Sequence, residues 1–244
     1  MLFGLFFGDW TILLVLPGMI FAIVAQIMVQ SSYKKYSKVQ APAGMTGGAL
    51  ARRMLDCNGM SDVNIEIVKG ELSDHYDPKK RVLRLSDAVF HGNNVAAVGV
   101  AAHEVGHALQ DAKHYAPLRL RIALVPVCNV GSRLAMPMFL VGLLLSAFVA
   151  SSNGSLIGTY FMLAGIGAYA LAVLFQLVTL PVEFNASRRA LRVLTRSGTM
   201  SGAQLAGSRK VLSAAAMTYV AALATGLLSL LRLLLIASSA SRRR

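Results

Sequence analysis

Long stretches without any charged residue are the feature that most constrains how this chain can fold. No charge lies between Arg133 and Glu183, and none lies between Asp9 and Lys34. A helix needs about 20 apolar residues to cross a hydrocarbon core of about 30 Å. The sequence therefore predicts membrane helices at 10–33, 134–150 and 156–180.

The charges around the first apolar stretch predict its orientation. Asp9 precedes it, whereas Lys34, Lys35 and Lys38 follow it. A cleaved signal peptide would begin with basic residues and end at a small-residue cleavage site. Because Lys and Arg favour the cytoplasmic side, we expect an uncleaved anchor with its N-terminus outside and its C-terminal end in the cytoplasm.

Membrane anchoring also explains the net charge of +13. The basic residues flank the apolar stretches, as membrane anchoring requires. The sequence contains no recognised nucleic-acid-binding module and no aromatic residues interleaved with the basic ones. We therefore expect the lipid bilayer, and not nucleic acid, as the partner of these basic residues. Cys57 and Cys128 lack C-x-x-C spacing and predict neither a disulfide framework nor a thiolate zinc site.

The segment from Ser31 to Pro117 is the water-exposed, chemistry-bearing part of the chain, because it holds all five histidines and nine of the eleven acidic residues. Its patterns predict an amphipathic helix ending at Gly59, two strands with period-two alternation, a turn and a second helix capped by Gly92-Asn93. These elements are expected at 44–58 (helix), 63–67 (strand), 74–78 (turn), 81–85 (strand) and 94–110 (helix).

A strand directly before the second helix has two readings. An exposed edge there could bind an extended peptide by adding it as another strand. The two strands could equally form an ordinary structural hairpin, and the sequence leaves both open.

The helix expected at 94–110 carries His103, Glu104 and His107 in the sequence HEVGH. Residues four apart lie on the same face of a helix, so both imidazoles can share one metal ion. This is the H-E-x-x-H arrangement, in which the histidines bind Zn²⁺ and the glutamate acts as general base. A helix with about ten apolar residues before the motif is too short to place it inside a bilayer.

A catalytic zinc site needs a third protein ligand. His75, His91 and His114 are possible, but each is isolated. Glu183 is the better candidate because it is the only acidic residue after Asp111 and directly follows a membrane stretch. A carboxylate there is costly unless it faces a metal or a cation. Two crossings between His107 and Glu183 return the chain to the same side, although a salt bridge to adjacent arginines is the alternative.

The fold class expected is α+β: a multi-pass, mainly α-helical membrane protein with a small zincin-like cytoplasmic catalytic domain containing a short β-hairpin or sheet. Residues 122–130 either lie at the interface or extend the first helix of the membrane pair. The last segment either spans the membrane or is interfacial. The segments expected are 1–33 (anchor), 34–117 (catalytic domain), 118–182 (membrane hairpin), 183–210 (cytoplasmic helical segment with the third ligand) and 211–244 (apolar, with a basic tail).

Three motifs carry a family resemblance, namely HEVGHALQ, LSDHYDP and LVTLPVEFNASRRAL. They resemble the YugP-like family of neutral zinc metallopeptidases of bacterial membranes, and the layout is similar to that of the HtpX and CAAX-protease type of membrane gluzincin. The resemblance implies a cell-membrane location in a bacterium and a third zinc ligand in an E-x-x-x-D motif. Glu183 matches that glutamate, but Ser187 stands where the aspartate, a partner of a ligating histidine, would be.

The function expected is that of a membrane-anchored zinc endopeptidase that cleaves a peptide or protein substrate, with Glu104 as general base. The resemblance implies membrane-protein quality control. Candidate donors for the oxyanion are His75, Tyr76, His114 and Arg188. The rival is a non-catalytic scaffold or partner-binding protein whose structural zinc has a fourth protein ligand, such as His75 or His114. A homo-oligomer or a membrane-protein partner stays open.

Overall fold

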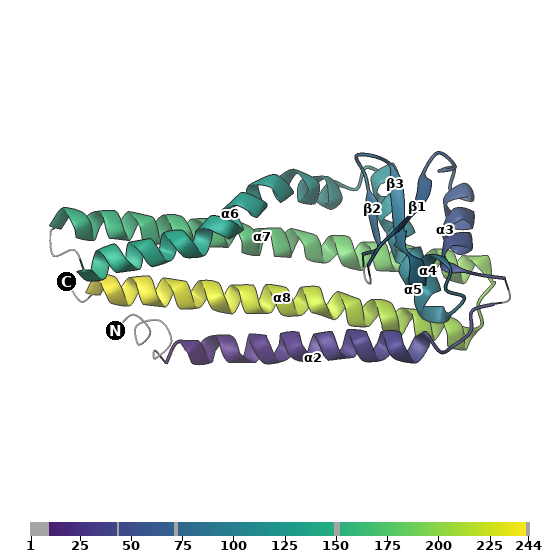
Figure 1. Cartoon of the computed structure of the whole chain (residues 1–244), viewed down its shortest axis with the longest axis horizontal. Coiled ribbons are helices and arrows are strands. Elements are labelled where there is room, and N and C mark those ends of the chain that lie inside the picture. The colour runs from purple at the N-terminus through teal and green to yellow at the C-terminus, as the bar shows by residue number, and fades with distance from the viewer. Residues whose placement is uncertain (1–9, 43, 71–72, 149–151, 243–244) are drawn as a thin grey trace. The chain divides into compact units, whose positions relative to one another are not determined.

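A computed structural model describes residues 10–42, 44–70, 73–148 and 152–242. The described chain is mostly helical, with a small three-stranded sheet (Figure 1). The long helices are α2 (Ile12–Tyr36), α6 (Ala116–Phe148), α7 (Ser152–Ser197) and α8 (Gly202–Arg242). The shorter elements are α3 (Gly47–Asp56), β1 (Asn64–Val68), β2 (His75–Asp77), β3 (Val82–Ser86), α4 (Asp87–Phe90) and α5 (Val95–Ala112).

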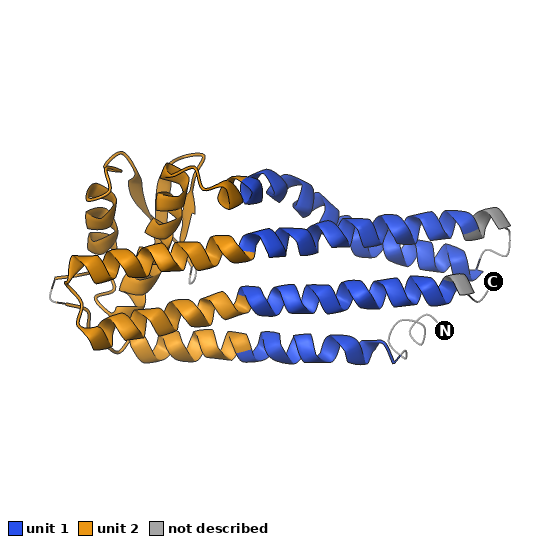
Figure 2. Cartoon of the chain, turned by 180° about the vertical axis from the view of Figure 1, so that it is seen from behind, with its two compact units in different colours: residues 1–24, 120–179, 219–244 blue, residues 25–119, 180–218 orange. Residues whose placement is uncertain are grey.

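The chain divides into two compact units (Figure 2). Unit 1 comprises 1–24, 120–179 and 219–244, and unit 2 comprises 25–119 and 180–218. Helices α2, α6, α7 and α8 each continue from one unit into the other. All five histidines lie in unit 2.

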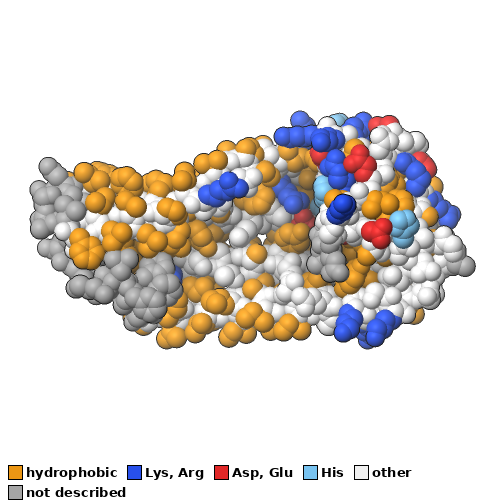
Figure 3. Space-filling view, in the orientation of Figure 1, with side chains coloured by type: hydrophobic (Ala, Val, Ile, Leu, Met, Phe, Trp, Pro, Cys, Tyr) orange, Lys and Arg blue, Asp and Glu red, His pale blue; other side chains and the backbone are white. Residues whose placement is uncertain are grey.

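Four described helices are long and apolar enough to cross a membrane. In unit 1 their surfaces expose large apolar side chains, including Leu13, Ile20, Leu163 and Leu177. Figure 3 shows hydrophobic side chains over much of these helices, whereas acidic and histidine side chains gather over the short elements of unit 2. The described residues of the predicted membrane stretches are thus helical, apart from the turn at Trp10 and Thr11. Residues 151–155, which separate the second and third predicted membrane helices, fall partly outside the described residues, and α7 is helical from Ser152.

Helix α6 resolves one of the alternatives left by the sequence. It runs without interruption from Ala116 through Pro126 and Pro137 to Phe148, so residues 122–130 extend the first helix of the pair. Glycines bring α6 and α7 together in unit 1. A Cβ added at Gly142 would lie 2.5 Å from the backbone nitrogen of Met162.

The sheet of unit 2 has the order β1-β3-β2. The strands expected at 63–67 and 81–85 are confirmed, but they do not form a hairpin, because β1 and β3 pair in parallel. The turn expected at 74–78 is wrong. His75–Asp77 forms β2, which pairs antiparallel with β3. The strand before the motif helix is therefore central, consistent with the full burial of Leu83 and Leu85, and the edges are β1 and β2.

Helices α3 and α5 pack on the sheet and on the unit 2 part of α7 through one apolar core, which includes Leu55, Val105 and Leu194. Gly59 follows α3 in the left-handed region, at φ 71°, as a helix stop requires. The cap of α5 differs from the one expected. It is Asn94, whose side chain accepts a 3.0 Å hydrogen bond from the backbone N–H of Ala97.

Candidate metal centre

Three side chains from α5 and α7 converge in unit 2. One ligand atom each from His103, His107 and Glu183 lies within 4.8 Å of the others. Oε2 of Glu183 is 3.2 Å from Nε2 of His103 and 3.6 Å from Nε2 of His107. The Nε2 atoms of both imidazoles therefore face the same carboxylate oxygen, as expected if all three atoms surround one ion.

A close approach of two backbones brings these residues together. Gly106 lies between the histidines on α5, and a Cβ built there would lie only 2.5 Å from the carbonyl oxygen of Ala186 on α7. Ala186 lies between Glu183 and Ser187. Only glycine at position 106 allows the helices to approach this closely, because any side chain would collide with backbone atoms.

Glu183 is 2 % exposed, and its ion-pair contacts include both imidazoles. The adjacent Arg189 donates from Nε to Oδ1 of Asn185 at 2.7 Å. A buried carboxylate is costly unless it is paired. The structure thus brings the Glu183 carboxylate to both imidazoles of α5.

The second nitrogen of each imidazole also has a partner. Oγ of Ser187 lies 3.1 Å from Nδ1 of His103, so the serine occupies the position expected of the family's aspartate partner. Nδ1 of His107 lies 3.0 Å from Oε1 of Gln110. With a proton on each Nδ1, the Nε2 lone pairs point to the cluster, as metal binding requires.

Gln110 is a residue that the sequence reasoning missed. It is fully buried, and its Nε2 donates to the carbonyl of Val182 at 2.8 Å and to Oδ1 of Asn185 at 3.1 Å. Its position three residues after His107, on the same helical face, could have identified Gln110 from the sequence. Gln110 therefore links the histidine of α5 to the α7 turn that carries Glu183.

Glu104 is 8 % exposed, and its pKa is raised to about 7. Burial is the largest cause, because it disfavours the charged carboxylate. The negative charges of Glu183 and Asp74 act in the same direction, whereas His103 and the backbone N–H of Tyr76 oppose them. The carboxylate that follows His103 is thus buried beside the cluster and close to β2.

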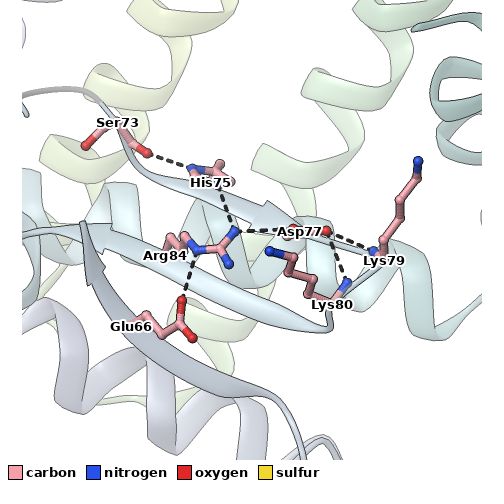
Figure 4. Close-up of polar contacts among 7 residues, drawn as sticks. All are labelled: Glu66, Ser73, His75, Asp77, Lys79, Lys80 and Arg84. Atoms are coloured by element: carbon pink, nitrogen blue, oxygen red, sulfur yellow. Dashed lines mark hydrogen bonds and ion pairs between the residues drawn. The ribbon is translucent and has the colours of Figure 1, made fainter. Parts of the chain in front are cut away.

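The other histidines do not join this group of described residues. Nδ1 of His75 donates to the carbonyl of Ser73 at 2.8 Å, and its Nε2 faces Arg84 at 3.4 Å (Figure 4). His91 contacts Asp87 at 3.2 Å. His114 is exposed beyond the end of α5, at φ 50°. None of the three is therefore a neighbour of Glu183 in the cluster.

Two residues named as oxyanion donors also have other surroundings. The hydroxyl of Tyr76 donates to Oδ2 of Asp111 at 2.9 Å. Burial and this carboxylate raise the pKa of Tyr76. Arg188 lines a groove between α7 and α8. The contacts described here assign no oxyanion donor.

The donor set fits zinc. Two imidazole nitrogens and one carboxylate oxygen are the ligands of many catalytic zinc sites, in which a fourth position stays open. The cluster has these three donors among the described residues, and all are part-buried or buried. The hydrogen-bonded Nδ1 atoms add the orienting contacts that zinc-binding histidines usually make.

Comparisons with known proteins agree with this chemistry. The family model described as "Putative neutral zinc metallopeptidase" matches residues 11–238. The Bacillus subtilis (strain 168) protein named "Putative membrane protease YugP" is 49% identical over 212 residues, which are 87% of this chain and 89% of that protein. No solved structure gives a significant match. With the four apolar helices, these matches support a bacterial membrane protein. The chain belongs to the neutral zinc metallopeptidase family.

Proposed function

We propose that this protein is a membrane-anchored zinc endopeptidase whose metal is held by His103, His107 and Glu183. The observation that carries the proposal is the convergence of these three donors within 4.8 Å of one another. Family membership supports it. The three-donor set favours a catalytic site over a structural one, because structural zinc is normally closed by four protein ligands.

Glu104 is the general base of the proposed reaction. When bound, zinc polarises a carbonyl and lowers the pKa of a water molecule. The Glu104 carboxylate takes a proton from the attacking water and delivers it to the leaving amine. Its burial next to His103 supports this role, since a dry carboxylate holds a proton more readily than an exposed one.

We propose that strand β2 aligns the substrate. It is an edge strand, it contacts α5, and the backbone N–H of Tyr76 lies beside the Glu104 carboxylate. An extended peptide can add to such an edge by main-chain hydrogen bonds. Recognition through the main chain suits an enzyme that cleaves unfolded or extended protein segments.

We further propose that unit 2 lies in the cytoplasm, because it carries 18 of the 24 Lys and Arg residues. Cys57 is exposed in unit 2, and Cys128 is buried in unit 1. In intact cells, a membrane-impermeant maleimide should leave Cys57 of a Cys128→Ser variant unlabelled until the membrane is permeabilised. Labelling of intact cells would place unit 2 outside.

Quality control of membrane proteins is the proposed cellular role.

The decisive experiment compares Glu104→Gln with the wild type and with Glu66→Gln, an exposed glutamate on β1. Purified full-length protein is loaded with zinc, its zinc content is measured, and cleavage of labelled casein is followed. We expect Glu104→Gln to keep zinc and to lose at least about 100-fold in cleavage, and Glu66→Gln to match the wild type. Cleavage that survives Glu104→Gln, or a wild type that holds zinc with a fourth protein ligand and cleaves nothing, would refute the mechanism.

A further inference from the structure

A groove of about 630 Å³ lies in unit 2 between the facing parts of α7 and α8. Its rim carries four exposed arginines, and its floor is apolar. We call it the arginine groove. The rim residues are Arg188, Arg192 and Arg196 on α7 and Arg209 on α8.

The charge of the arginine groove is not balanced by the protein. The sequence has no Asp or Glu after Glu183. Within the described residues, none of the four rim arginines forms an ion pair or a side-chain hydrogen bond. Arginines spaced four apart on one helix repel each other unless an anion lies between them. The groove therefore has the charge of an anion site.

The rim arginines of α7 and Glu183 lie on different sides of that helix, although Ser187, whose Oγ contacts His103, also lines the groove. At about 100° per residue, Arg188 and Arg192 point roughly 140° and 180° away from Glu183. Ala186 and Ala190, which are fully buried, face the core with α5. An occupant of the groove would thus not be a ligand of the proposed zinc.

The floor of the groove is suited to an acyl chain or another apolar group. Leu212 and Ala216 are buried, and Phe184 and Leu191 are partly buried. The chain that forms the groove also adjoins the apolar stretches in sequence. Residues 156–182 of α7 carry no charge, and neither do residues 211–231 of α8. An occupant with an anionic head and an apolar tail would match both the rim and the floor.

We propose that the arginine groove binds the phosphate headgroup of an anionic phospholipid from the leaflet next to unit 2. Guanidinium groups bind phosphate through paired, charge-assisted hydrogen bonds, and they do so better than ammonium groups. Basic pockets beside membrane helices are known sites for anionic headgroups. The bound lipid clamps α7 to α8 next to the turn of α7 that supplies Glu183.

The test measures lipid binding by the purified full-length protein in a neutral detergent with native mass spectrometry. Phosphatidylglycerol and phosphatidylcholine are the probes. The variant is Arg192→Gln/Arg196→Gln, and the matched control is Lys34→Gln/Lys38→Gln, which removes the same charge from exposed side chains at and just beyond the C-terminal end of α2. We expect the wild type and the lysine control to bind phosphatidylglycerol at least about tenfold more tightly than phosphatidylcholine, and the arginine variant to lose this preference.

Several results would overturn the proposal. The first is equal binding of the two lipids by the wild type, and the second is unchanged binding of phosphatidylglycerol by the arginine variant. The third is a loss of binding in the lysine control as large as that in the arginine variant, which would mean that the overall positive charge, and not the groove, attracts the lipid. Displacement of the lipid by millimolar inorganic phosphate would assign the site to free phosphate, and displacement by a micromolar polyglutamate peptide would assign it to protein. If the double variant loses its helical circular dichroism, the single variant Arg209→Gln on α8 decides instead.

Discussion

Oε1 of Gln110 lies 3.0 Å from Nδ1 of His107, and the Nε2 of the same amide donates to the carbonyl of Val182. One side chain thus fixes the tautomer of His107, a proposed metal ligand, and contacts the turn of α7 that carries Glu183. An amide can do both because it carries an acceptor and two donors. Gln110 therefore links the two helices that carry the proposed zinc ligands, without being one of those ligands.

Replacing Gln110 by Ala should weaken zinc binding by about 10- to 100-fold, as loss of a histidine's hydrogen-bond partner commonly does. Gln110→Glu keeps an acceptor for His107 but removes the donors to Val182 and Asn185. Titration of the purified protein with zinc against a chelator gives the affinities. We expect the Glu variant to lie between the wild type and Ala. Wild-type affinity in Gln110→Ala would show that the amide does not position His107.

Ser187 supports the other histidine, with Oγ 3.1 Å from Nδ1 of His103. Ser187→Ala should lower zinc affinity, within the same range of about 10- to 100-fold. Ser187→Asp should raise it above that of the wild type, because a carboxylate makes the imidazole a stronger ligand. The same chelator titration ranks the three proteins. An Asp variant that binds zinc more weakly than Ala would mean that the buried site cannot hold the added charge.

Glu183 should be indispensable for metal binding. Glu183→Ala removes one of three donors and should leave zinc below stoichiometric amounts after dialysis, whereas Asp111→Asn, on α5 but outside the cluster, should retain it. Inductively coupled plasma mass spectrometry measures the content. Addition of zinc should also raise the unfolding temperature of the wild type and not of Glu183→Ala, since a ligand stabilises the state that binds it. Stoichiometric zinc in the variant would remove Glu183 from the ligand set.

Much of this molecule follows from local patterns in the sequence. Uncharged stretches predict the long helices, and spacing on one helix predicts the pairing of His103 with His107. The two predicted helices between His107 and Glu183 are present as α6 and α7, and the structure brings Glu183 to the histidines. These inferences succeed because each depends on residues close in sequence or on one simple periodicity.

Long-range pairing is where the sequence was insufficient. Asp74 and Pro78 favour a turn, yet pairing with β3 makes His75–Asp77 a strand, and this insertion leaves β1 and β3 parallel. The contact of Gln110 with Val182 joins residues far apart in the chain. Propensity describes single segments, and such pairings depend on packing that no single segment specifies.

We expect Asp77, on β2, to make a pH-dependent contribution to the stability of the folded protein. Oδ2 of Asp77 accepts from Arg84 at 3.2 Å, and Oδ1 accepts from the backbone N–H groups of Lys79 and Lys80 (Figure 4). Burial opposes ionisation, but these hydrogen bonds and the guanidinium outweigh it and hold the pKa of Asp77 below its usual value. The ionised carboxylate therefore stabilises the folded state above the usual pKa of about 3.9, and this is lost as pH falls through the depressed value.

Asp77→Asn tests this contribution, because the amide oxygen still accepts from the backbone N–H groups, whereas the charge and the acceptor for Arg84 are lost. We expect the variant to unfold at a lower temperature than the wild type at pH 7, and the difference to disappear as the pH falls below 3.9. Asp62→Asn is the control. Asp62 pairs with Arg81 at 3.1 Å, but both side chains are more than half exposed, so little change is expected at any pH. A difference for Asp77→Asn that persists at low pH would assign its effect to packing.

The close approach of α5 and α7 makes Gly106 the most sensitive position near the site. A Cβ there would lie 2.5 Å from the Ala186 carbonyl oxygen, so Gly106→Ala must push the helices apart and separate the histidines from Glu183. The variant should lose about 1–3 kcal/mol of stability through overpacking and bind zinc more weakly.

Gly99→Ala is its control on the same helix. A Cβ at Gly99 would lie 3.4 Å from Cβ of Ser208, an ordinary contact, so this variant should keep wild-type zinc affinity and could gain up to about 1 kcal/mol from helix propensity. Chelator titration and thermal unfolding of both variants measure the two effects. Equal zinc affinity in the two alanine variants would show that the spacing of the helices at Gly106 does not set the geometry of the metal site.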